Sequence, residues 1–129
     1  MTARAFMTRW PIAVAVVLAC GGVPLAATAR SLGCPAPQAV HGPGVLKETP
    51  VQIAELGSLL ASGDRVNRAP VVVADLRKRY PGVSNAEIAN YLITAYCPVV
   101  AKLDGLSMAE QRARMEQFAH QARVAVYGK

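Results

Sequence analysis

The stretch that decides the fold covers residues 84–103 and reads SNAEIANYLITAYCPVVAKL. Ser84 is followed three residues later by Glu87, the spacing of a capping box, in which each side chain accepts a hydrogen bond from the other residue's backbone amide. A helix is therefore expected to begin here. Apolar residues recur along one side of it at intervals of three and four, and others widen that face: Ile88, Tyr91, Leu92, Ala95, Val99 and Leu103, with Ala89, Ile93, Tyr96 and Val100. A face this broad predicts the central helix of a small bundle.

Two residues near the end of this stretch predict further features, a covalent attachment and a helix break. Cys97 falls at the flank of the apolar face, where a tethered segment would lie across the outside of the packed side. Pro98 lacks an amide hydrogen and crowds the carbonyl of Thr94, so the helix is expected to kink or break there. A second short turn would follow before Asp104-Gly105 ends the segment.

The remaining chain predicts three more helices. Thr49-Pro50 begins one over residues 50–62, and the capping box of Ser107 and Glu110 begins another over 108–126. The third covers residues 68–80, with Pro70 near its start, although three consecutive valines at 71–73 leave a short strand as an alternative. Together with a helix over residues 85–103, these segments predict an all-α, four-helix domain over residues 49–129.

Residues 30–48 are rich in proline and glycine and follow neither helical nor strand periodicity. They predict an extended N-terminal arm in which Val45-Leu46 docks into an apolar groove. His41 lies among glycines and is interpreted as a solvated loop residue.

The first 29 residues have the features of a cleavable export signal. Arg4 and Arg9 form a basic start, an apolar run follows, and Ala27-Thr28-Ala29 is a small-residue cleavage site before Arg30. Cleavage between Ala29 and Arg30 would place the mature protein in the periplasm or cell envelope.

Two alternatives to this processing remain open. Residues 17–20, Val-Leu-Ala-Cys, resemble the lipobox of bacterial lipoproteins, in which Cys20 becomes the lipidated first residue. Alternatively, the uncharged run over residues 10–29 is long enough to span a bilayer as an uncleaved anchor. Contact with a membrane is expected only through one of these two routes.

The charge of the mature chain argues against nucleic-acid binding. The whole chain has 14 Lys and Arg and 8 Asp and Glu, and losing Arg4 and Arg9 leaves 12 against 8, a net charge of +4. These charges are dispersed, with no interleaved aromatic residues.

The cysteine count predicts one structural disulfide. If Cys20 is removed or lipidated, Cys34 and Cys97 remain as a pair in an oxidising compartment. There is no C-x-x-C motif, so a redox role is not favoured.

No catalytic or cofactor motif is found in the sequence, and its acidic residues are scattered. Glu116 and His120, four residues apart, are interpreted as a surface pair and not as half of a metal site. A small-ligand carrier or enzyme is the third functional hypothesis, and it requires a cavity among Tyr80, Tyr91, Tyr96 and Phe118.

One resemblance adds to this interpretation. Residues 79–82, Arg-Tyr-Pro-Gly, followed by residues 91–99, YLITAYCPV, resemble a pattern in small exported bacterial proteins of unknown function. The similarity covers about residues 70–126 and implies an exported helical domain, with no activity attached. The leading hypothesis is a non-enzymatic protein, without a cofactor, that binds a protein or envelope partner or supports the envelope; the runner-up is a membrane-tethered lipoprotein.

Overall fold

The computed structural model describes residues 31–37 and 44–128. These residues form four helices: α1 (Pro50–Ala61), α2 (Arg65–Arg79), α3 (Asn85–Ala101) and α4 (Met108–Tyr127). The described ranges contain no strand, and the valines at 71–73 lie within α2. The prediction of a small all-α, four-helix domain is confirmed.

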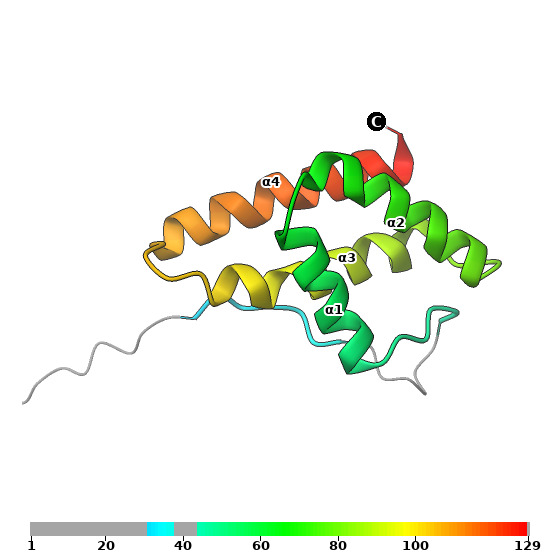
Figure 1. The fold of residues 1–129 in the computed structure, drawn as a ribbon, viewed down its shortest axis with the longest axis horizontal. Coiled ribbons are helices and arrows are strands. Elements are labelled where there is room, and N and C mark those ends of the chain that lie inside the picture. Colours follow the sequence, from blue (N-terminus) through cyan, green and yellow to red (C-terminus); the bar gives the residue numbers. More distant parts are fainter. Residues whose placement is uncertain (1–30, 38–43, 129) are drawn as a thin grey trace, which may run out of the picture.

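Helix α3 lies at the centre of the arrangement, with α1 crossing it on one side and α4 packed along another (Figure 1). Helix α2 packs mainly against α4. Residues 31–37, drawn in cyan, run alongside α3, and residues 44–49 lead into α1 (Figure 1). The segment identified from its sequence as central therefore has neighbours on several sides.

Three of the helices begin with complete capping boxes. Ser84 Oγ accepts from the amide of Glu87 at 3.2 Å, while the Glu87 carboxylate accepts from the Ser84 amide at 3.0 Å. The same reciprocal pairs join Thr49 with Gln52 and Ser107 with Glu110. Each box satisfies two amides that a helix start otherwise leaves unpaired, so these three starts are where the sequence predicts them.

The predicted start of the second helix is wrong by three residues. Helix α2 begins at Arg65, and Asp64 is its N-cap residue. Pro70 is consequently the sixth residue of the helix and not its first-turn proline. The connection from α1 contains only residues 62–64, and the side-chain amide of Asn67 donates to the Asp64 carboxylate. The helix therefore begins directly after Asp64, which follows the short loop. The proline at position 70 had predicted a start about one turn later.

The predicted break at Pro98 is also wrong, because α3 continues through it to Ala101. Pro98 is exposed and lies three residues before Ala101, the last residue of the helix. A proline removes one hydrogen bond, which a helix packed on several sides tolerates near its end. The helix ends at Ala101, two residues before the predicted end at 103, and Lys102 is its C-cap.

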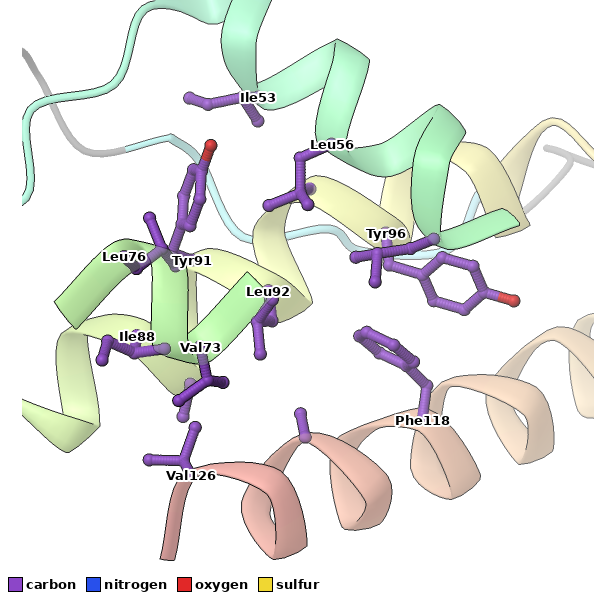
Figure 2. Packing of buried hydrophobic residues seen from close by; sticks show 14 of the residues in the cluster. Ile53, Leu56, Val73, Leu76, Ile88, Tyr91, Leu92, Tyr96, Phe118 and Val126 are labelled. Atoms are coloured by element: carbon purple, nitrogen blue, oxygen red, sulfur yellow. The ribbon is translucent and has the colours of Figure 1, made fainter. Parts of the chain in front are cut away.

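The core is built around α3. Its fully buried large side chains come from all four helices: Tyr96, Phe118, Leu60, Leu76, Ile88, Leu92, Val73 and Val100. Figure 2 shows Tyr96 directed toward Phe118, and the two ring centroids lie 4.2 Å apart. Tyr91 points from α3 toward the side of Ile53 in α1 (Figure 2). Tyr96 therefore packs against α4, whereas Tyr91 faces α1.

A glycine allows helices α1 and α3 to cross in close contact. Gly57 in α1 lies directly over Ala95 in α3, where an added Cβ would lie 2.2 Å from the Ala95 carbonyl oxygen. No side chain fits at that distance. The helices touch at Gly57 and separate on either side of it, which matters for the groove described below.

Candidate functional site

The predicted disulfide is present between Cys34 and Cys97, whose Cα atoms are 5.6 Å apart. It fastens residues 31–37 to the last turns of α3, and Cys97 is buried beneath the attachment. The other residues singled out for processing, Cys20, Ala29 and Arg30, lie outside the described residues, as do the signal segment 1–29 and His41.

A buried carboxylate, not predicted from the sequence, joins the second part of the arm to the bundle. Glu48 is only 5% exposed. Its Oε1 accepts from the Arg79 guanidinium at 2.5 Å and from the Tyr80 hydroxyl at 2.9 Å, and its Oε2 accepts from the Tyr91 hydroxyl at 3.2 Å. Arg79 also pairs with Asp75 at 2.7 Å, as the four-residue spacing predicts. These residues, 48, 75, 79, 80 and 91, are called the Glu48 cluster.

The environment of this cluster shifts the pKa of its members. Burial, reinforced by the charge of Glu48 and the hydrogen bond to it, raises the pKa of Tyr91 far above its ordinary value. Burial and the hydrogen bond to Glu48 also raise the pKa of Tyr80. Both phenols are therefore neutral hydrogen-bond donors at neutral pH, which suits them to holding a carboxylate and not to accepting a proton.

Glu87 provides a second attachment for the arm. One carboxylate oxygen completes the capping box with Ser84, and the other accepts from the backbone amides of Val45 at 2.6 Å and Leu46 at 3.4 Å. The hydrogen bonds from Ser84 contribute most, followed by that from Val45, and together they lower the pKa of Glu87 to about 2. A single side chain thus begins α3 and fastens the arm, with Leu46 buried beside it.

A small cavity lies between the two attachments. Its volume is about 30 Å³, and its lining includes Pro37, Leu46, Glu48, Ile53, Tyr91 and Thr94. That volume holds about two water molecules. It is too small for an organic ligand, so this cavity belongs to the structural contacts of the arm.

A larger, open groove lies on the other side of Pro37. It has a volume of about 520 Å³ and is lined by twelve residues from the arm, from α1 and from the end of α3 through Leu103. Pro37, Ile53 and Thr94 line both the groove and the small cavity, so the two are adjacent. We call this the arm groove.

The lining of the arm groove is mostly apolar, and the geometry of the fold explains why it is hollow. Small side chains, including Ala54 and Ala95, line it next to the close crossing at Gly57, where the helices begin to separate. The arm contributes Pro35 and Pro37 to the lining, one and three residues after Cys34. The disulfide therefore fixes the position of one wall.

A single charged residue, Lys102, lines the arm groove. In the described part of the chain, no carboxylate lies within ion-pair distance of its ammonium group. The groove therefore combines an apolar surface with one unpaired positive charge at the end of α3.

The structure does not bring together the four aromatic residues proposed from the sequence as a pocket. Tyr80 and Tyr91 meet at Glu48, while Tyr96 stacks on Phe118 in the core. The basic run at 77–79 also has internal contacts: Arg77 donates to the Val126 carbonyl at 2.8 Å and to Asn85 at 2.9 Å. These arginines stabilise the fold and do not form a free basic patch.

Glu48 escaped the sequence analysis, although a signal for it exists. Alternate residues of an extended chain lie on the same side, so a buried Leu46 directs Glu48 toward the bundle as well. The groove had no signal of this kind, because its walls come from residues more than 60 positions apart, such as Pro35 and Val99.

Residues 31–37 and 44–128 contain neither a metal-binding cluster nor a membrane-spanning helix. No group of three or more His, Cys, Asp or Glu is placed to hold a metal ion there, and Glu116 and His120 have no third ligand. Among the helices of this part of the chain, none has both the length and the apolar character that a membrane span requires.

Comparison of the chain with protein-family models, with curated proteins and with solved structures finds no match. The arm groove and the segments around it are therefore the features from which a function can be inferred.

Proposed function

We propose that this chain is a small exported, non-enzymatic binding protein of the periplasm or cell envelope, with the arm groove as its binding surface. The observation that carries the proposal is the groove itself. It is open, mostly apolar and of the size of ligand sites, which typically occupy about 300–1,000 Å³.

Export is supported by two independent features. The first 29 residues have the composition of a signal peptide. The disulfide between Cys34 and Cys97 is a bond that persists in oxidising compartments and is rare where thiols are kept reduced. Both features support a location of the mature protein outside the cytoplasm.

A binding role fits the arrangement of the polar groups better than a catalytic one. The carboxylates that are held firmly, Glu48 and Glu87, are engaged by the arm and by helix ends. The neutral phenols beside Glu48 hold it in place. The groove, by contrast, offers contact area and one charge.

The test is the intact mass of the protein recovered from the soluble and membrane fractions of cells, with and without reduction and alkylation. The expected species is soluble, begins at Arg30, and has two cysteines that alkylate only after reduction. A protein that retains residues 1–29 in the cytoplasm with free thiols would refute the proposal.

The same measurement distinguishes the alternative of a lipoprotein. In that case the protein would be found in the membrane fraction, begin at an acylated Cys20, and lose its acyl chains in the Cys20→Ser variant. A membrane species with an unmodified Cys20 and an intact leader would instead show an uncleaved anchor.

A further inference from the structure

We infer that the arm groove binds a long-chain fatty acid, with the acyl chain along the apolar walls and the carboxylate at Lys102. This inference rests on the proposed binding function and specifies its ligand. It follows from the size of the groove, the composition of its walls and the position of its one charge.

The size of the groove favours a small amphiphile over a protein. A stable protein interface uses about 20–30 residues on each side. Twelve residues line the arm groove, about half that number. The volume of about 520 Å³ lies within the range of small-ligand sites and is far above that of the neighbouring cavity.

The walls favour an acyl chain. Ile53, Ala54, Val99 and Leu103 present aliphatic carbon, and the prolines of the arm add ring faces without amide donors. None of the twelve residues is aromatic, so stacking on a planar ring is not available. Aliphatic contact with a flexible chain is what this surface offers.

The charge fixes the head group and its orientation. Lys102 caps the C-terminus of α3, where the helix dipole places partial negative charge. Without the lysine, that end of the groove would repel a carboxylate. Since the ammonium has no ion-pair partner among the described residues, it is available to a ligand's anionic head. Glu48 and Glu87 line the small cavity and do not line the arm groove.

The experiment uses the purified protein with its disulfide intact and measures displacement of a fluorescent long-chain fatty acid. Palmitate should displace the probe, and its methyl ester, which has the same chain and no charge, should bind more weakly. Across saturated acids of increasing length, affinity should rise about twofold per added methylene, as expected for a chain half covered by protein.

Substitutions at two positions locate the site. Ala54→Phe fills the groove from an exposed position of α1 and should abolish displacement. Lys102→Gln should weaken palmitate binding about threefold and Lys102→Glu about tenfold, because each removes or reverses one exposed charge interaction. Neither Lys102 substitution should alter binding of the methyl ester by more than about twofold, since that ligand has no charge to pair.

Matched controls on α2 keep these results specific. Ala74→Phe places the same ring at another exposed helical alanine, and Lys78→Gln removes another exposed lysine. Both should leave palmitate binding unchanged. Melting temperatures within a few degrees of the parent show that Ala54→Phe and Lys102→Glu are folded.

Several outcomes overturn the inference. One is the absence of displacement by palmitate in protein of confirmed mass and disulfide content; this result leaves the proposed export intact. A second is binding that persists in Ala54→Phe, or equal binding of palmitate and its ester. A concentration-dependent dimer that Ala54→Phe dissociates would assign the groove to a second copy of the chain and would also overturn it.

Discussion

Substitution of Gly57 by alanine tests the helix crossing that shapes this fold, because local and tertiary effects predict opposite signs. Within a helix, Gly→Ala normally stabilises by about 1 kcal/mol. In this structure, the added Cβ would lie 2.2 Å from the Ala95 carbonyl oxygen, whereas ordinary van der Waals contact begins at 3.4 Å. The difference, 1.2 Å, is the distance by which α1 and α3 must separate.

The cost of that separation exceeds the gain in helix propensity. A gap of about 1 Å forfeits a quarter to a half of the dispersion energy of the contacts that it opens. The obstacle is backbone and cannot rotate away, so the upper end of the usual overpacking cost, about 3 kcal/mol, applies. Subtracting the propensity term leaves a net loss of about 2 kcal/mol. For a domain of this size, the melting temperature should fall by about 8–16 °C.

Thermal and urea unfolding followed by far-ultraviolet circular dichroism measure this loss. Ser58→Ala is the control, because Ser58 is the next residue of the same helix, is exposed, and bonds only to its own helix at the Ala54 carbonyl. It should change the melting temperature by no more than a few degrees. A Gly57→Ala protein as stable as the parent, or more stable, would refute the close crossing.

Three further predictions concern the attachments of the arm. Replacing Cys34 and Cys97 together by serine should lower the free energy of unfolding by about 4 kcal/mol, the chain-entropy value for the 63-residue separation, measured by urea denaturation. Glu48→Ala should cost about 3 kcal/mol in the same assay, because it leaves the buried hydroxyl of Tyr91 without its acceptor. Stability should fall as pH decreases from about 4.5 to about 2, because the folded pKa of Glu87 is depressed and the unfolded chain takes up its proton first. The urea midpoint measured against pH should therefore decline over that range.

Each of these predictions has its own control. The reduced parent protein should match the double serine variant, and equal stability of the oxidised and reduced forms would contradict the disulfide argument. Glu55→Ala changes an exposed carboxylate of α1 and should cost less than about 0.5 kcal/mol. In the Glu87→Gln variant, the urea midpoint should decline less between about pH 4.5 and about pH 2 than in the parent protein. If the variant and the parent show the same decline, Glu87 is not its cause.

Much of the fold could be predicted because its signals are local. A capping box consists of a residue and another three positions later, and an apolar face repeats within a few turns, so both can be identified without knowing what lies opposite. The misplaced start at Arg65 and the continuous helix through Pro98 show the limit of such signals. A proline indicates a boundary, but neighbouring contacts decide whether the helix continues.

The pairing of Cys34 with Cys97 was also predictable, because export leaves those two cysteines as the pair. The residues that bury Glu48 were not, since Arg79, Tyr80 and Tyr91 are 31 or more positions away from it. Tyr91 was expected in the apolar face, and only its contact with the arm shows that its hydroxyl has a carboxylate partner.

The sequence by itself therefore determined the four-helix composition, the N-terminal caps of α1, α3 and α4, and the covalent attachment, because each depends on residue types at short spacing or on the number of cysteines. The tertiary structure alone decided the burial of Glu48, the close approach at Gly57 and the arm groove with Lys102 at its end. These features depend on which side chains meet when helices cross. That is set by packing over the whole domain, where a one-turn shift of α1 against α3 would replace every contact.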